Sequence, residues 1–128
     1  MKTIVAGSRE ITDIRLVRQA LKSAPWQVTE IVSGAARGVD SLGEAVAREV
    51  GLPIKRFPAD WNGLGRRAGP LRNIQMAEYA DALVAVWDGV SRGTAHMIEE
   101  AEKRGLRVFV YNIREIKEKP SRPRFQSF

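Results

Sequence analysis

The stretch VSGAARGVDSLGEAVAREV, residues 32–50, decides the fold of this chain. A short apolar run leads into Gly34 and Gly38, and a segment of helical period follows. We expect a strand, a turn and a helix that opens at Asp40. The turn leaves two interpretations open, a tight connection between strand and helix or a cradle for an anion.

The same alternation of strand and helix extends over most of the chain. Apolar, β-branched runs predict five strands, at residues 2–6, 30–33, 54–57, 82–87 and 107–112. The segments between them have helical period, and their apolar faces are Ile14, Val17 and Leu21, then Leu42, Val46 and Val50, then Leu71, Ile74 and Ala77, and then Ala95, Ile98 and Ala101. This alternation predicts an α/β fold, a Rossmann-like three-layer arrangement around a parallel sheet. Right-handed crossovers favour the strand order 3-2-1-4-5.

One domain accounts for nearly all of the 128 residues. We place this domain at residues 1–113 and expect residues 114–128, which include Pro120 and Pro123, to form a basic and flexible tail. No apolar run approaches the roughly 20 residues of a membrane span, and the early charges at the N-terminus do not fit a signal peptide. We therefore expect a cytoplasmic protein that has no membrane partner.

The residue types also limit the chemistry. The sequence has no cysteine, and its single histidine, His96, which we expect on the surface, excludes a multi-histidine metal centre. We expect neither a metal nor a cofactor. The formal net charge of +6 is concentrated in residues 55–72, with five basic residues against Asp60 for +4, and in residues 114–128, with five against two for +3. These clusters predict an anionic partner, either a phosphate-bearing small molecule or nucleic acid.

Three loops carry glycines at the carboxyl ends of predicted strands. The first strand runs into residues 7–9, the second into residues 34–40, and the fourth into DGVSRGTAHM, residues 88–97. The carboxyl ends of parallel strands meet at one edge of the sheet, where helix N-termini bind anions through free N–H groups. We therefore predict a ligand site at this edge. Three arginines on these loops are placed to bind an anion: Arg9, Arg37 and Arg92.

Several residues near this edge have two interpretations. Asp40 would contact a ribose hydroxyl or simply cap a helix, and Thr94 has the same two alternatives. Trp61 would stack on a base or cover the core. Arg72 and Asn73 are expected where the third helix begins, facing the ligand site.

The motifs AGSR, VSGAARGVD, PADW, AGPLRNIQMAEYADALVAVWDG and RGTAHMI follow one another along the chain. Together they resemble the SLOG superfamily, the Rossmann-like fold that the DNA-processing Smf/DprA proteins share with the LOG phosphoribohydrolases. The resemblance covers roughly residues 2–112 and is greatest to the small YspA-type, cpYpsA-related branch. It implies a nucleotide or a nucleotide-derived ligand, such as an ADP-ribose-like molecule.

The resemblance also implies which residues bind this ligand. The first phosphate-facing loop of the family is matched by Gly7, Ser8 and Arg9. The second is matched by Gly34, Arg37, Gly38 and Asp40. An Arg-x-x-x-Met element and a Gly-Thr turn, both shared with the hydrolase branch, are matched by Arg72, Asn73, Met76, Gly93 and Thr94.

The chain departs from the hydrolase branch at one catalytic position. That branch has a glutamate three residues after the threonine, and Met97 stands there in this sequence. Glu100 lies about one helical turn further from the site. A general acid or base is then missing at the glycosidic bond. The resemblance therefore favours a binding protein, a sensor or processing module, and leaves enzymatic activity uncertain, with Arg72 and Asp40 as the remaining catalytic candidates.

Two alternative functions remain open. The first is a phosphoribohydrolase-like enzyme that cleaves an N-glycosidic or phosphate linkage. The second is a DprA-like nucleic-acid-binding protein that places its basic residues on phosphates. SLOG relatives are commonly dimers, and exposure of Leu64, Leu71 and Met76 around the third helix predicts a symmetric homodimer that buries this helix or the next one.

Overall fold

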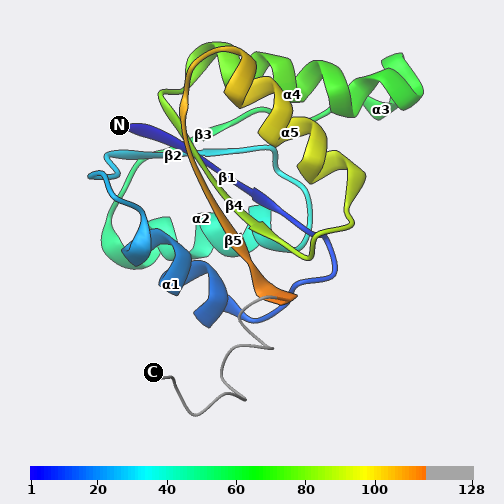
Figure 1. Cartoon of the computed structure of the whole chain (residues 1–128). Coiled ribbons are helices and arrows are strands. Elements are labelled where there is room, and N and C mark those ends of the chain that lie inside the picture. Colours follow the sequence, from blue (N-terminus) through cyan, green and yellow to red (C-terminus); the bar gives the residue numbers. More distant parts are fainter. Residues whose placement is uncertain (115–128) are drawn as a thin grey trace.

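Five parallel strands form the centre of the molecule in the computed structural model, which describes residues 1–114 (Figure 1). The strands are β1 (Lys2–Gly7), β2 (Glu30–Ser33), β3 (Ile54–Arg56), β4 (Ala82–Trp87) and β5 (Arg107–Asn112). They pair in the order β3-β2-β1-β4-β5, and every pair is parallel. The α/β Rossmann-like fold and the strand order 3-2-1-4-5 are therefore confirmed.

Helices cover both faces of this sheet (Figure 1). They are α1 (Ile14–Ser23), α2 (Val39–Val50), α3 (Trp61–Leu64), α4 (Ala68–Tyr79) and α5 (Arg92–Lys103), with a 3-10 turn, η1 (Gly65–Arg67), between α3 and α4. Helices α1 and α2 pack on one face of the sheet, and α4 and α5 pack on the other. The result is the three-layer arrangement that right-handed strand–helix–strand units produce.

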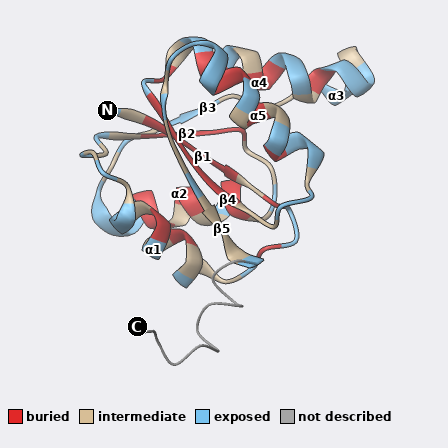
Figure 2. Cartoon of the chain, in the orientation of Figure 1, coloured by how far each residue is buried: buried red, intermediate tan, exposed pale blue. Residues whose placement is uncertain are grey.

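Each face of the sheet has its own hydrophobic core (Figure 2). Side chains alternate along a strand, so Ile4 of β1 enters the core beneath α4 and α5, whereas Val5 enters the core beneath α1 and α2. Both residues are almost completely buried. The central strands β1 and β4 are thus covered on both faces, which explains why their sequences are continuous apolar runs.

The start of α2 differs from the prediction. The helix begins at Val39, and its cap position is Gly38, which has a φ of 75°, so Asp40 is not the helix cap. A side chain at position 38 is also excluded by space, because a Cβ atom there would lie 2.5 Å from the Ser8 carbonyl oxygen and from Arg9 Cα. Gly38 therefore allows the β2–α2 loop to pack directly against the β1–α1 loop.

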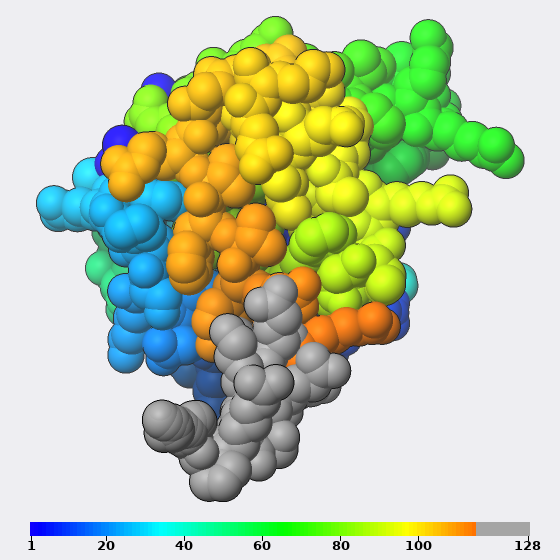
Figure 3. Space-filling model, in the orientation of Figure 1, coloured from blue at the N-terminus to red at the C-terminus, as the bar shows by residue number. Residues whose placement is uncertain are grey.

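Residues 61–67 form α3 and η1, which the sequence pattern does not predict. Asp60 caps α3, since its Oδ1 accepts a hydrogen bond of 2.9 Å from the Gly63 N–H. No residue of α3 or η1 is buried, and the segment projects from the body of the molecule, in green at the upper right of Figure 3. Helix α4 then begins at Ala68, two residues before Pro70, which the first turn of a helix tolerates.

The buried face of α4 differs from the predicted apolar face. Leu71 belongs to the apolar face that the periodicity predicts, but it is 40% exposed, as the dimer prediction expects. Met76, which the same dimer prediction expects to be exposed, is 2% exposed. The polar residues Arg72 and Asn73 are buried beside Met76. The expectation of an exposed Met76 was therefore wrong, because the helix turns its polar pair and this methionine inward together.

Helix α5 shows the same pattern. Ala95 is exposed, whereas Thr94, Met97 and Glu100 are buried. The buried faces of α4 and α5 are thus partly polar where the two helices contact each other and approach the carboxyl edge of the sheet.

No helix in residues 1–114 is both long enough and apolar enough to cross a membrane. The basic tail predicted for residues 114–128 falls outside the described residues, apart from Arg114.

Candidate functional site

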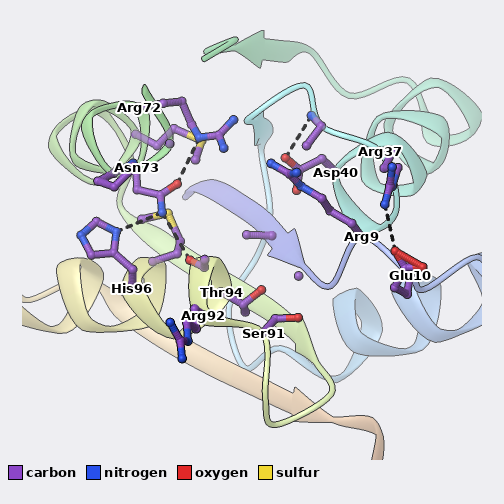
Figure 4. Close-up of a pocket in the computed structure, with 18 of the residues that line it drawn as sticks. Arg9, Glu10, Arg37, Asp40, Arg72, Asn73, Ser91, Arg92, Thr94 and His96 are labelled. Atoms are coloured by element: carbon purple, nitrogen blue, oxygen red, sulfur yellow. Dashed lines mark hydrogen bonds and ion pairs between the residues drawn. The ribbon is translucent and has the colours of Figure 1, made fainter. Parts of the chain in front are cut away.

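A cavity of about 600 Å³ opens at the carboxyl edge of the sheet, beside the ends of β1 and β4 (Figure 4). The strand order changes direction between these two strands, since β2 and β3 lie on one side and β5 on the other. Open parallel sheets bind their ligands at such a switch point. The cavity therefore lies at the edge where the sequence predicts a ligand site, and its volume suits a small molecule.

Residues from distant parts of the chain meet in this cavity. Eight of the predicted ligand-binding residues line it: Gly7, Arg9, Arg37, Asp40, Arg72, Asn73, Gly93 and Thr94. The other three, Ser8, Gly34 and Gly38, are not part of the lining. Glu10, Trp61, Ser91, Arg92, His96 and Met97 also contribute.

Ser8, Gly34 and Gly38 hold the loops around the cavity in place. Ser8 is 1% exposed, and its hydroxyl accepts a hydrogen bond of 3.3 Å from the Asp88 N–H. The Gly34 carbonyl accepts a hydrogen bond from the Arg72 guanidinium. These contacts connect the β1–α1 loop to the β4–α5 loop, and the β2–α2 loop to α4, so the three residues shape the cavity from behind its surface.

A hydrogen-bonded chain links α4 to α5 along one wall (Figure 4). Arg72 Nε donates to Asn73 Oδ1 at 3.1 Å, and Asn73 Nδ2 donates to the Gly93 carbonyl at 3.3 Å. The same amide nitrogen lies 3.1 Å from His96 Nδ1. Because Arg72 Nε can only donate, the Asn73 oxygen must face it, which directs the amide nitrogen to His96.

His96 is half-buried in this wall, so the expectation of a surface histidine was wrong. As the acceptor of the Asn73 amide, Nδ1 leaves the proton of the neutral imidazole on Nε2. Nε2 lies 3.5 Å from Glu100 Oε2, one turn along α5. The spacing of four residues between His96 and Glu100 is the sequence signal that could have placed this histidine on the inner side of the helix.

Asp40 is the buried carboxyl group of the site, with 7% of its surface exposed. Its Oδ2 accepts a hydrogen bond of 3.2 Å from the Ala36 N–H. Burial raises the pKa of Asp40 to about 6, although the Ala36 N–H and the charge of Arg72 oppose the rise. Burial likewise lowers the pKa of Arg72, and the charge of Asp40 opposes that change. A carboxyl group that titrates near neutrality and lines a cavity is suited to hydrogen bonding and to proton transfer.

The first turns of α2 and α5 both begin at the cavity without a side-chain cap. The cap position of α5 is Ser91, whose hydroxyl instead bonds to Ser8 Oγ at 3.1 Å and to Asp88 Oδ2 at 3.2 Å. The cap position of α2 is Gly38, which has no side chain to offer. In α2 the Val39 N–H already donates to the Ser8 carbonyl at 3.3 Å. The next N–H groups of that turn and the leading N–H groups of α5 are therefore the ones available to an anion, which the helix dipole also favours.

Three further arginines surround these helix ends. Arg37 pairs with Glu10 at 2.9 Å, and both side chains are largely exposed. Arg9 and Arg92 line the cavity without a carboxylate partner within ion-pair distance in the part of the chain that the structure describes. In Figure 4 the Arg9 side chain lies beside Asp40, and Arg92 lies at the start of α5. The cavity thus combines backbone donors with free guanidinium groups.

The position of the hydrolase glutamate is occupied by a buried apolar group. Met97 lines the cavity, is 1% exposed, and belongs to the core beneath α4 and α5. Glu100 is outside the lining and is held by Arg104 and Lys103. Thr94 is buried in the first turn of α5 and is not its cap. Asp40 is therefore the buried carboxyl group that remains at this cavity.

The described residues contain no group of three or more histidine, cysteine or acidic side chains arranged to hold a metal ion. Arginines and backbone N–H groups dominate the polar lining instead, and these are donors that bind anions.

Comparison with known proteins is consistent with this architecture. A family model described as the YspA, cpYpsA-related SLOG family matches residues 1–63. The Gene 61 protein of Mycobacterium phage D29 is 35% identical over 117 residues, which span 84% of this chain and 93% of that protein. No solved structure matches the chain. Membership of the family indicates, in general terms, binding or processing of a nucleotide-related ligand. The chain belongs to the YspA, cpYpsA-related SLOG family.

Proposed function

We propose that the protein binds a nucleotide-derived ligand of the ADP-ribose type in this cavity and acts as a sensor or processing module. The observation that carries the proposal is the meeting of two uncapped helix N-termini, those of α2 and α5, with the guanidinium groups of Arg9 and Arg92. Each feature favours an anion, and their meeting in one cavity suits a phosphate or a diphosphate.

The first turns of the same two helices also offer partners for a sugar. Asp40 presents a carboxyl group that can accept hydrogen bonds from ribose hydroxyls, and the Thr94 hydroxyl lies on the same lining. Arg72 and Asn73 are already hydrogen-bonded to each other and to neighbouring backbone, so their side chains are fixed before a ligand arrives. A rigid polar wall reduces the entropy that binding costs.

Calorimetric titration with ADP-ribose and with AMP tests the proposal. Arg92→Ala should weaken binding about tenfold or more, since a charge-assisted hydrogen bond contributes about 1.5 kcal/mol or more. Lys22→Ala, which removes an exposed cation from α1, is the matched control and should leave affinity within about twofold. Equal affinity in wild type and Arg92→Ala would show that the anion does not bind at the start of α5. If the wild type binds neither ligand, the proposal is rejected.

Hydrolysis of an N-glycosidic linkage is the second candidate, and the environment of Asp40 favours it. Its pKa of about 6 makes this carboxyl a suitable general acid or base near neutral pH. Because Met97 cannot transfer a proton, we expect no release of free base from nucleoside 5′-monophosphates by the wild type. Release that disappears in Asp40→Asn would establish the enzyme, and the product is measured by chromatography.

Nucleic-acid binding has less support from the basic residues between positions 55 and 72. Arg56 is paired with the buried carboxylate of Glu44 at 3.1 Å, and Arg72 is buried in the cavity wall. Both are therefore occupied within the protein, which leaves Lys55, Arg66 and Arg67 exposed for phosphate contacts. A titration with single-stranded DNA at two salt concentrations tests this alternative, since phosphate contacts would give a steep loss of affinity as salt rises.

A further inference from the structure

Trp61 lines the cavity without serving the core. The residue is 49% exposed, and it belongs to neither of the two core clusters. No residue of α3 or η1 is buried, so the segment that carries Trp61 makes no core contribution that would explain a tryptophan. Among the lining residues that the structure describes, Trp61 is the only tryptophan, tyrosine or phenylalanine.

The indole is nevertheless held in a defined place. Asp60 caps the short helix by accepting the Gly63 N–H, which fixes the start of α3. The indole ring then lies against the first turn of α4, where a Cβ atom on Gly69 would be 3.2 Å from Trp61 Cη2. Any larger residue at position 69 would press on the ring. Asp60 thus caps the helix that carries Trp61, and Gly69 leaves space for the indole ring, although this side chain is not part of the core.

The face of the ring already contacts a planar cationic group. The Arg9 guanidinium carbon lies 5.6 Å from the ring centroid, and both residues line the cavity. A guanidinium group and a nucleobase are both flat and both stack on indole. A base that takes the place of the guanidinium would release Arg9 toward the phosphate of the same ligand.

We propose that Trp61 is the base-stacking residue of the site and that the ligand carries a purine base. This inference rests on the proposed nucleotide-binding function. The bicyclic indole overlaps a bicyclic purine over a larger area than a pyrimidine, so purine nucleotides bind more tightly than pyrimidine nucleotides. Phosphate binds at the start of α5, and the base lies across the cavity on α3.

The test uses two probes that differ only in the base, AMP and ribose 5-phosphate, with the full-length protein. Trp61→Ala should lower the affinity for AMP by about 5- to 100-fold, the range for loss of one base–aromatic stack. It should leave ribose 5-phosphate within about twofold, and Trp61→Phe should recover most of the affinity for AMP. Leu64→Ala is the matched control, because Leu64 lies on the same short helix but not on the cavity lining, and AMP affinity should be unchanged.

The other outcomes separate this inference from the proposed function. If Trp61→Ala weakens the binding of AMP and of ribose 5-phosphate equally, α3 has a structural role and the stacking is overturned. The same conclusion follows if Leu64→Ala weakens AMP binding as much as Trp61→Ala does. The stacking is also overturned if wild type binds UMP as tightly as AMP, or if Trp61→Ala leaves the affinity for AMP unchanged. A wild type that binds ribose 5-phosphate as tightly as AMP leaves the anion site standing but rejects the base contact. A wild type that binds neither probe rejects the proposed function, and the stacking with it.

Discussion

Asp40 and Arg72 face each other across the backbone of Gly34. A Cβ atom on this glycine would lie 2.5 Å from Arg72 Nη1 and 2.8 Å from Asp40 Oδ2. Arg72 also donates a hydrogen bond to the Gly34 carbonyl, so the buried guanidinium is fixed at this point. The glycine at position 34 is therefore required by the approach of two charged side chains.

Gly34→Ala should lower the free energy of unfolding by about 1–3 kcal/mol, the usual cost of forcing an added methyl group into packed surroundings. Chemical denaturation measures the change. Gly93→Ala is the control, because a Cβ atom there would have no neighbour within 4 Å and would favour the helix. If the two variants are equally stable, the approach of Asp40 and Arg72 does not restrict position 34.

Asp40→Asn should change how stability depends on pH. Burial raises the pKa of this carboxyl from 3.8 to about 6, so between these pH values the folded state holds more protons than the unfolded state. The stability that protonation provides is complete below about pH 4 and is lost as pH rises through about 6. At pH 7 the variant should therefore be more stable than wild type by on the order of 2–3 kcal/mol.

The measurement is a set of urea denaturation curves at pH 4 and pH 7. The difference between Asp40→Asn and wild type should be small at pH 4 and appear at pH 7. A constant difference at both values would mean that Asp40 does not titrate in this range. Glu102→Gln, a change in an exposed carboxylate on α5, is the control.

Asn73→Ala should destabilise the protein and separate α4 from α5. The amide accepts from Arg72 and donates to the Gly93 carbonyl, and it is 7% exposed, so its loss leaves buried polar groups without partners. The expected cost is about 1–3 kcal/mol. Gln75→Ala, on the exposed face of the same helix, should cost far less. Thermal denaturation distinguishes the two, and equal melting temperatures would show that the chain of hydrogen bonds contributes little.

Self-association stays a prediction, and one of the three apolar residues that predicted the interface is no longer exposed. Met76 is buried, and Leu71 on α4 is the exposed apolar residue of the predicted interface, at 40%. We expect a dimer by light scattering at tens of micromolar and a shift toward monomer in Leu71→Asp. Val50→Asp, at an exposed apolar position on α2, should leave the mass unchanged. A monomeric wild type would argue against the dimer altogether.

The sequence predicts the sheet well because the strands follow simple rules. Runs such as residues 82–87 are apolar and β-branched, are buried on both faces, and end at glycine-bearing loops. Right-handed crossovers then leave few strand orders. The position of the cavity could be predicted for the same reason, since the carboxyl ends of parallel strands meet at one edge of the sheet.

The rest of the site was harder to predict, for a physical reason. A helix that serves a core alone shows an apolar stripe, but α4 and α5 bury Arg72, Asn73 and Thr94 toward the cavity. Such polar residues interrupt the stripe, so periodicity alone includes Leu71 in the apolar face although its side chain is exposed. Segment 61–67 lacks any apolar period, so periodicity could not reveal α3. The spacing of four residues to Glu100 is a local signal for His96, but its contact with Asn73, 23 residues away, is not visible in the local sequence.

The open first turns of α2 and α5 also bear on motion. The two helices lie in different layers of the fold, yet both begin at the same cavity. Amide hydrogens at such turns exchange readily with solvent, and a bound anion that accepts from them slows this exchange. A single bound ligand would therefore slow amide exchange in both helix layers, so that one binding event would reduce local opening on both sides of the sheet.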